Sequence, residues 1–351
     1  MNKINKHNKF YKDKKVLITG HTGFVGSWLS LLMLKFNSKV YGISKNALDN
    51  SFNYKNLSIK NDLKGEYFLD INNFNNLNKK IKIIKPDIIF HLAAQPYVIE
   101  GYENPIDTLK TNIIGTANLL RSSLENKIKH NVIITSDKCY NNLDKKTFFN
   151  ENSEMGGSDP YSVSKGCAEL ITKSFSQSYN NNIYIHTVRA GNIIGGGDFG
   201  KNRLIPDIYY SKIKNKKLNI RYPNAIRPWQ NILDVINSYS YIPVAQASIK
   251  NRYDCWNIGP RTNDAKINVI ELVEKFLKNF DKNKQIKVRI KNNHLKESII
   301  LMLNSNKIRK KLNWKNIFNT NQTIKQTSEW YKICLNGSRS ELKEYSIKLL
   351  N

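Results

Sequence analysis

Two side chains suited to proton transfer, Tyr161 and Lys165, lie four residues apart in this 351-residue sequence. On a helix that spacing places both on one face, one turn apart. A lysine cation beside a tyrosine favours the tyrosinate, so Tyr161 is suited to act as a general base at neutral pH. Upstream, Ser136, Asp137 and Lys138 follow an apolar run and add a hydroxyl, an acid and a second amine. Together these residues predict an active site built for proton transfer.

A glycine-rich segment near the N-terminus predicts a dinucleotide site. Residues 16–19 form an apolar run typical of a buried strand, after which Gly20, Gly23 and Gly26 lead into an apolar helix that reaches about Phe36. We expect Gly20 to permit a sharp turn, Gly23 to let the backbone approach a pyrophosphate, and Gly26 to bring the helix close to the sheet. The helix N-terminus would then attract the anion. Alone, the three glycines also suit a turn in any α/β protein.

Further apolar runs extend this unit into a parallel sheet. We expect loop structure over 46–65. The second strand ends without the acid that commonly binds the ribose 2′-hydroxyl of NAD, so NADP stays open, with Lys45 available to a 2′-phosphate. Asp70 is expected either to accept a hydrogen bond from adenine or to cap the helix that begins near Asn73. The expected strands are 39–43, 66–69, 86–91, 132–135, 188–192 and 285–290, and the expected long helices are 104–125 and 160–180.

Two polar residues lie in apolar surroundings. His91, at the end of a predicted strand, is expected to be a packed, hydrogen-bonded residue rather than a base. Asn112 lies within the predicted helix 104–125. We expect its side chain either to hydrogen-bond within a break in that helix or to align an active-site water.

The net charge suggests nucleic-acid binding, but the distribution of the basic residues argues against it. The 56 Lys and Arg residues against 28 Asp and Glu give a net charge of +28. The basic residues are spread along the whole chain, which favours a biased surface composition over RNA binding, so no nucleic-acid partner is expected. The four cysteines have no short spacing, which predicts neither a metal site nor a disulfide framework and fits a reducing compartment. No apolar run reaches the length of a membrane span, and we expect a cytoplasmic protein.

Eight segments carry a resemblance that covers about residues 15 to 335. The sequence is similar to the extended short-chain dehydrogenase/reductase family, and within it to the NAD-dependent nucleotide-sugar dehydratases that act on CDP-glucose. The acid after Ser136 favours a dehydratase, because related epimerases tend to carry a neutral pair there. The segments are GHTGFVGSWLS at 20–30, FHLAAQPYV at 90–98, TSDKCY at 135–140, EMGGSDPYSVSKGCAEL at 154–170, VRAGNIIGGGD at 188–198, RLIPD at 203–207, IRPWQNIL at 226–233 and WNIGPR at 256–261.

The resemblance implies an α/β fold with a Rossmann-type doubly wound parallel sheet and a smaller, mostly C-terminal substrate-binding α/β lobe. It divides the chain into a polar extension at 1–14, an NAD-binding core with the catalytic residues at 15–190, and a mainly nucleotide-sugar-binding lobe at 191–351 that is interwoven with the core. The long helices 104–125 and 160–180 are apolar enough to pair with a second subunit, so a homodimer or homotetramer is expected.

The resemblance also implies a mechanism. Tyr161 takes the proton of the sugar C4 hydroxyl, to which Ser136 hydrogen-bonds, while a tightly bound NAD accepts the hydride. Lys138 removes the C5 proton and Asp137 protonates the departing C6 hydroxyl, after which the hydride returns to C6. An alternative role for Lys138 is a salt bridge that holds Asp137, because a base must be neutral and the reference pKa of lysine is about 10.4.

Binding residues are implied on both sides of the site. Asn192 is expected to hold the substrate diphosphate, Arg227 to bind phosphate through a bidentate guanidinium, and Arg261 to add a second contact. Alternatives are another nucleotide-sugar dehydratase, a 4-epimerase or, more distantly, a non-catalytic protein that binds NAD and RNA. The implied cofactor residues are Gly20, Thr22, Gly23, Phe24, Val25, Gly26, Asp70, Ile71, Leu92, Ala93, Ala94, Asn112, Tyr161 and Lys165, and the implied substrate residues are Gln95, Ser136, Asn192, Arg203, Leu204, Arg227 and Arg261.

Overall fold

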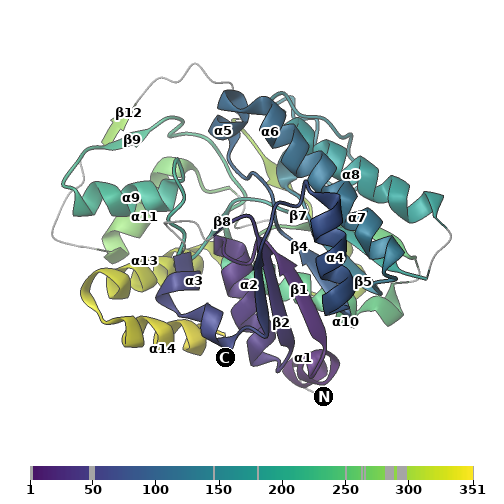
Figure 1. Cartoon of the computed structure of the whole chain (residues 1–351). Helices are drawn as coiled ribbons and strands as arrows, with labels where there is room; N and C mark the ends of the chain where they lie inside the picture. Colours follow the sequence, from purple (N-terminus) through teal and green to yellow (C-terminus); the bar gives the residue numbers. More distant parts are fainter. Residues whose placement is uncertain are drawn as a thin grey trace.

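A parallel sheet forms the centre of the protein (Figure 1). The computed structural model describes residues 3–46, 52–144, 147–179, 182–249, 251–261, 264, 266–280, 288–290 and 299–350, and within them the sheet has seven strands in the order β11-β7-β5-β4-β1-β2-β3. This order is that of a doubly wound Rossmann sheet with an added edge strand. The strands are β1 (Lys15–Thr19), β2 (Lys39–Ser44), β3 (Gly65–Phe68), β4 (Ile88–His91), β5 (His130–Ile134), β7 (Tyr184–Ala190) and β11 (Tyr253–Ile258).

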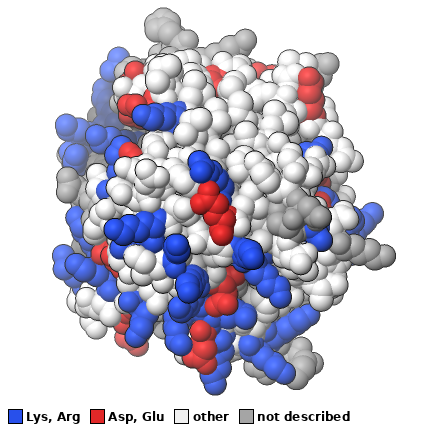
Figure 2. Space-filling model, turned by 45° about the vertical axis from the view of Figure 1, so that its right-hand side comes forward, with Lys and Arg blue, Asp and Glu red and all other residues white. Residues whose placement is uncertain are grey.

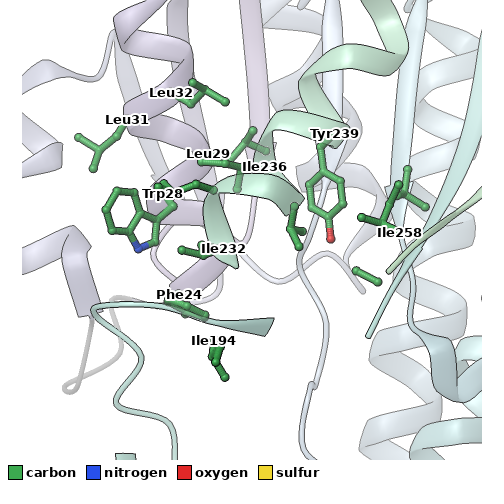
Figure 3. Packing of buried hydrophobic residues seen from close by; sticks show 14 of the residues in the cluster. Phe24, Trp28, Leu29, Leu31, Leu32, Ile194, Ile232, Ile236, Tyr239 and Ile258 are labelled. Carbon is green, nitrogen blue, oxygen red and sulfur yellow. The ribbon is translucent and has the colours of Figure 1, made fainter. Parts of the chain in front are cut away.

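Helices cover both faces of the sheet because its strands are apolar on both sides. In β1, Val16 and Ile18 join the larger hydrophobic cluster, whereas Leu17 between them joins a second cluster on the other face. Helices α2 (Phe24–Lys35) and α10 (Ile232–Val244) pack together in the larger cluster, where Trp28 of α2 lies near Ile232 of α10 (Figure 3). Helices α4 (Phe74–Ile84) and α7 (Gly115–Glu125) pack together in the second cluster, and α8 (Pro160–Ser178) packs beside α7.

A second group of elements lies to one side of the sheet, on the left of Figure 1. It includes α9 (Leu204–Ile213), β9 (Leu218–Ile220), α11 (Val269–Phe280), α13 (Thr320–Asn336) and α14 (Arg339–Leu349). Strand β9 pairs with β12 (Val288–Ile290), and α11 packs on α13. Strand β11 and helix α10 belong to the Rossmann layers although they come from the C-terminal half of the chain.

Short elements connect these parts. The pairs β8 (Ile193–Ile194) with β10 (Gln230–Asn231) and β6 (Phe148–Phe149) with β13 (Met302–Leu303) are parallel. At the N-terminus, α1 (Lys3–Tyr11) packs on α10, and the buried Tyr11 hydroxyl donates to the Ser240 carbonyl at 2.7 Å. The other short helices are α3 (Phe52–Asn56), α5 (Val98–Glu103), α6 (Pro105–Leu109) and α12 (Asn306–Leu312).

The structure confirms the predicted α/β class and places the predicted strands to within a few residues, but it also contains strands that were not predicted, among them β11 of the main sheet, and it differs from the sequence-based expectations in four further places. The stretch 46–65 is not all loop, because it contains α3 and a 3₁₀ turn at Ile59–Asp62. The single helix expected at 104–125 is α6, a π-helical turn at Lys110–Ile114 and α7. Besides the predicted strand near 285–290, of which residues 285–287 lie outside the described part, the C-terminal region contains β13. The polar N-terminal segment forms a packed helix.

The surface carries the excess positive charge in a dispersed form. On the face shown in Figure 2, Lys and Arg gather toward the lower half and the left margin, with acidic residues among them. The upper part of that face carries fewer charges, and α6 and α8 lie at that height in Figure 1. Within the described residues, no helix is long and apolar enough to cross a membrane.

Candidate active site

A cavity of about 360 Å³ lies where several strands of the sheet end. Ligands of open α/β sheets bind at the carboxyl ends of the strands, because the connecting loops converge there. The cavity is lined by the residues after β4, β5 and β7, by the first turns of α2, α8 and α9, and by β9. Thirteen of the predicted site residues line it: Phe24, Val25, Leu92, Ala94, Ser136, Asp137, Lys138, Tyr161, Lys165, Asn192, Arg203, Leu204 and Arg227.

Ser136 and Asp137 occupy a tight turn directly after β5. Ser136 is the N-cap of the 3₁₀ turn Asp137–Cys139, and its Oγ accepts a hydrogen bond from the Lys138 backbone N–H at 3.2 Å. The same hydroxyl donates to Oδ1 of Asp137 at 3.0 Å. Oδ2 of Asp137 is buried and has no hydrogen-bond partner among the described residues. The turn therefore places the Asp137 side chain at the cavity wall, with one buried carboxyl oxygen that no described residue bonds.

The environment of Asp137 favours its protonated form. The side chain is almost fully buried, and burial raises its pKa, against the lowering influence of the Lys138 cation and of the Ser136 hydrogen bond. Gly191 makes this geometry possible, since a Cβ there would lie 2.9 Å from Asp137 Oδ2 and 2.4 Å from the Pro228 ring. A carboxyl group with a raised pKa can donate a proton to a leaving group.

Tyr161 and Lys165 face the cavity from the first two turns of α8. Asp159 caps this helix by accepting from the Ser162 N–H at 3.0 Å, and Pro160 occupies the first helical position. Both side chains are buried, and Lys165 Nζ lies 6.0 Å from the centre of the Tyr161 ring. The predicted one-turn relation of the two residues is confirmed.

Burial acts on both pKa values. It raises the pKa of Tyr161 to about 12, whereas a hydrogen bond with Ser136 and the Arg203 cation act to lower it. It lowers the pKa of Lys165 to about 8, against the raising influence of Glu169. Two of the residues that act on these values, Glu169 and Arg203, were not assigned that role from the sequence.

A buried ion pair holds the catalytic turn against α8. Glu169, one turn beyond Lys165, accepts from Arg189 Nη2 at 2.7 Å and from Thr187 Oγ1 at 2.7 Å, and the Thr135 hydroxyl donates to its other oxygen. Arg189 also donates to the Tyr140 hydroxyl at 2.8 Å. Both charged side chains are 2% exposed. Sequence reasoning missed this network, although Glu169 follows Lys165 at the helical spacing that would have placed it beside the site.

The glycine loop has the geometry of a dinucleotide cradle. Gly20 has a φ of +75°, which residues with a side chain rarely adopt. A Cβ at Gly26 would lie 2.1 Å from the Gly20 carbonyl oxygen. The N-cap of α2 is Gly23, so this helix begins without a side-chain cap. Thr22 does not line the cavity, and its Oγ1 donates to Ser44 Oγ at 3.2 Å. Ala93 lies behind the loop, where its N–H bonds to Thr19 Oγ1 at 3.2 Å.

The ends of β2 and β3 contribute Lys45 and Asp70. Lys45 Nζ lies 3.0 Å from Asp70 Oδ2, and the Asn72 N–H bonds to Asp70 Oδ1 at 2.9 Å. The alternative in which Asp70 caps the next helix is wrong, because Asn73 caps α4 by accepting from the Asn76 N–H. Neither Asp70 nor the buried Ile71 lines the cavity.

Asn112 ties three segments together from within the π-helical turn. Its Nδ2 donates to the Gln95 carbonyl at 3.0 Å and to Ser164 Oγ at 2.8 Å, and its Oδ1 accepts from the Gln95 N–H at 2.8 Å. The Gln95 side chain bonds to Thr108 and to the Tyr97 backbone. Neither Asn112 nor Gln95 lines the cavity, so both position its wall.

His91 is a packed residue, as predicted. Its ring nitrogens lie 2.7 Å from Thr19 Oγ1 and 3.2 Å from Thr116 Oγ1. Burial, with a contribution from the Lys165 cation, lowers its pKa to about 3, so the imidazole is neutral at ordinary pH.

The cavity wall also carries two of the cationic groups predicted for substrate. Arg203 is paired with Asp198 at 3.0 Å and lies over the Tyr97 ring at 5.0 Å. Arg227 is 5% exposed, and its Nη1 donates to the Ile299 carbonyl at 3.1 Å. Arg261 is exposed and bonds to the Asn316 carbonyl at 3.0 Å, away from the cavity lining. The structure therefore brings Arg203 and Arg227 to the cavity and leaves Arg261 outside it.

The doubly wound sheet, the glycine loop and the Ser136, Tyr161 and Lys165 group define a short-chain dehydrogenase/reductase enzyme. A model of the GDP-mannose 4,6-dehydratase family matches residues 17–327. The chain belongs to this family of NAD-dependent lyases, which confirms the resemblance found in the sequence.

Individual relatives agree with this placement. The CDP-glucose 4,6-dehydratase of Salmonella typhimurium is 38% identical over 96% of this chain and 97% of its own length. The dTDP-D-glucose 4,6-dehydratase of Dictyostelium discoideum is 30% identical over 75% of this chain and 62% of its own length. Among solved structures, Streptomyces venezuelae dTDP-glucose 4,6-dehydratase with NAD and TYD bound superposes with a TM-score of 0.80 at 20% identity, covering 91% of this chain and 97% of that one. This last likeness concerns the fold.

Proposed function

We propose that the protein is an NAD-dependent hydro-lyase that converts CDP-D-glucose to CDP-4-dehydro-6-deoxy-D-glucose and water. Its 38% identity over nearly the whole chain to a CDP-glucose 4,6-dehydratase supports the substrate. The observation that carries the reaction type is Asp137, a buried carboxyl group at the cavity with a raised pKa and one oxygen that no described residue bonds. The product would serve deoxysugar synthesis for surface polysaccharides such as a lipopolysaccharide O-antigen.

The residues at the glycine loop fit the pyrophosphate of NAD. Gly20 provides the positive φ of the turn, and Gly23 places the start of α2 beside the loop without a competing side chain. Phe24, Val25, Leu92 and Ala94 line the adjoining cavity. When bound there, NAD supplies the acceptor for the C4 hydride and the donor that later reduces C6.

Oxidation at C4 requires a base for the hydroxyl proton. Tyr161 accepts that proton, and Ser136, which hydrogen-bonds to Tyr161, binds the same substrate oxygen. The Lys165 cation, buried on the same face of α8, stabilises the negative charge that Tyr161 carries before the transfer. The resulting C4 carbonyl acidifies the neighbouring C5–H bond.

Elimination then removes one proton and one hydroxide. Lys138 lines the cavity and, in its neutral form, takes the C5 proton to become a cation, while Asp137 donates its proton to the C6 hydroxyl, which leaves as water. The C5–C6 double bond that forms is reduced by hydride at C6 and a proton at C5. The sugar has lost one water in total, and the cofactor ends in its starting redox state.

The diphosphate is held by a wall of the cavity that Arg227 and Asn192 form. Arg227 is a buried cation at the cavity, and its guanidinium can make charge-assisted bonds to phosphate oxygens. Asn192, directly after β7, adds an amide at the same wall. With the phosphates fixed there, the hexose reaches Tyr161 and Asp137.

A homodimer that pairs α6 and α8 of two copies completes this proposal. Large apolar side chains are exposed on these elements, with Ile106 72% exposed and Leu170 56% exposed. Leu170→Glu should yield a monomer in light scattering after gel filtration, whereas Ile347→Glu, on the distant α14, should not change the mass.

All four cysteines are free thiols, which supports a cytoplasmic location.

The proposed activity is tested by incubating the purified protein with NAD and, separately, CDP-, dTDP-, UDP- and GDP-glucose, followed by mass spectrometry and proton NMR. Loss of one water from CDP-glucose is the expected result. Turnover of another nucleotide alone would assign a different dehydratase, and a C4 epimer without water loss would assign an epimerase. Salt-sensitive RNA binding without turnover of any sugar would overturn the enzyme assignment.

A further inference from the structure

One acidic residue at the cavity has no part in the steps above. Asp207 lies in the first turn of α9, lines the cavity and is only partly exposed. Burial raises its pKa to about 6, against the lowering influence of Arg221 and together with the raising influence of Asp198. Arg221 follows β9 and also lines the cavity, and its Nη2 donates to the Asn202 carbonyl at 3.4 Å.

The position of Asp207 along the cavity follows from α9. Arg203, the N-cap of this helix, is near enough to Tyr161 to lower its pKa, so α9 begins beside the sugar end of the cavity. Asp207 is four residues on and lies one turn farther along the same helix face. In Figure 1, α9 and β9 lie on the side of the molecule away from α8. A nucleotide sugar whose hexose meets Tyr161 therefore directs its base toward Asp207 and Arg221.

The chemistry of this pair distinguishes pyrimidines. Cytosine presents an amino donor at C4 and acceptors at N3 and O2, whereas uracil and thymine present an acceptor at C4 and a donor at N3. A carboxylate accepts from the cytosine amino group but faces an oxygen in uracil, and a protonated carboxyl also donates to cytosine N3. The Arg221 guanidinium is a donor that suits O2. A site built to bond one pattern rejects the other, because its polar groups are left unpaired.

We infer that Asp207 reads the base of the substrate and selects cytosine over uracil and thymine by accepting a hydrogen bond from the exocyclic amino group. This inference rests on the proposed function, since it takes the occupant to be a nucleotide sugar. A first-turn acid also stabilises a helix through the helix dipole, and that role predicts an effect on stability and none on base preference.

The test is the affinity of the full-length protein for CDP, UDP, dTDP and GDP, measured by calorimetry. Asp207→Asn keeps the shape of the side chain and adds an N–H that can donate to the uracil C4 oxygen. We expect the wild type to prefer CDP and Asp207→Asn to lower the ratio of CDP to UDP affinity by about 10- to 100-fold, as for the loss of a hydrogen bond to a charged group. The control Glu271→Gln changes the first-turn acid of α11, which does not line the cavity, and should leave the ratio unchanged.

Several results would overturn the inference. One is an unchanged ratio of CDP to UDP affinity in a folded Asp207→Asn variant. Another is tighter binding of GDP than of CDP by the wild type. Asp207→Leu removes both hydrogen-bonding oxygens and should weaken CDP more than UDP. Because the measurement needs no turnover, it is separate from the proposed reaction: failure to dehydrate CDP-glucose with an intact CDP preference would remove the function and leave the base contact.

Discussion

The two ends of the cavity are built differently. At the catalytic end, Ser136, Asp137 and Tyr161 are buried, and the backbone that carries them is tied to neighbouring elements by the Glu169–Arg189 ion pair. At the end that we propose binds the nucleoside, the partly exposed Asp207 lies in a short helix and Arg221 directly follows a short strand. Proton and hydride transfers require groups that are already in place, whereas base selection requires polar groups that remain free to bond a ligand.

The difference separates residues whose loss affects folding and chemistry from residues whose loss affects only affinity. If the two ends differ in this way, substitutions behind the catalytic end should lower the free energy of unfolding, and substitutions in the catalytic turn should stop one chemical step. Substitutions toward the proposed nucleoside end should change only ligand affinity.

The largest effect is expected from the ion pair behind the catalytic turn. Glu169→Gln leaves the Arg189 cation buried and uncompensated, which should cost about 3–5 kcal/mol of unfolding free energy. Urea denaturation measures this value. The control is Glu329→Gln, which removes an exposed pair with Lys325 and should cost about 0–1 kcal/mol. Equal losses of unfolding free energy in the two variants would mean that the Glu169–Arg189 ion pair does not stabilise the catalytic end more than an exposed pair stabilises the surface.

The next effect concerns a single chemical step. Asp137→Asn retains the bond to Ser136 but cannot donate an acidic proton, so water loss should slow by about 100-fold. Oxidation at C4 should continue, so reduced cofactor should accumulate on the enzyme and be visible by its absorbance. If Asp137→Asn slows the formation of reduced cofactor as much as it slows water loss, the residue does not serve as the acid of the elimination.

A smaller effect is expected from a cation of the cavity wall. Arg227→Ala removes a buried cation and should raise KM by about 10- to 100-fold with little change in kcat, since we propose that this residue binds phosphate and not the reacting carbons. Arg261→Ala provides the comparison, because this guanidinium lies away from the cavity lining. Steady-state kinetics with both variants decides the point, and a loss confined to kcat in Arg227→Ala would place this residue in the chemistry.

The smallest effect is a pH dependence. Because burial lowers the pKa of Lys165 to about 8, its cation predominates below that pH and disappears above it. If the cation stabilises the Tyr161 tyrosinate, kcat/KM should decline several-fold as the pH rises past about 8, since this ratio reports the free enzyme. The pH profile of Lys138→Ala separates the two lysines, and it is measured as formation of reduced cofactor because this variant lacks the proposed C5 base. If the decline is absent in Lys138→Ala, it belongs to Lys138 and not to Lys165.

Local motifs explain how much could be predicted from the sequence. The glycine loop, the strand ends and the Tyr161–Lys165 pair were predicted correctly, because each depends on a few consecutive residues. The Glu169–Arg189 pair was missed because its partners lie on a helix and a strand that only the fold brings together. A break in the helix at Asn112 was one of two alternatives, but the bonds of Asn112 to Gln95 and Ser164 were not predicted because they are tertiary.

Two further misses have the same origin. The sequence could not place Arg261, whose predicted substrate role has no support in its position outside the cavity. The sequence also did not single out Asp207. An acid in the first turn of a helix is ordinarily explained by its interaction with the helix dipole. The raised pKa of Asp207 depends on burial, which only the tertiary structure shows.

The most direct test of the central claim, that one preassembled cavity oxidises, dehydrates and reduces the same sugar, follows a single hydrogen. CDP-glucose carrying deuterium at C4 is converted in ordinary water, and the product is analysed by NMR. The account predicts that the deuterium appears at C6 and that the same conversion of unlabelled substrate in D2O places one deuterium at C5. Deuterium lost to water, released on the free cofactor or retained at C4 would contradict it.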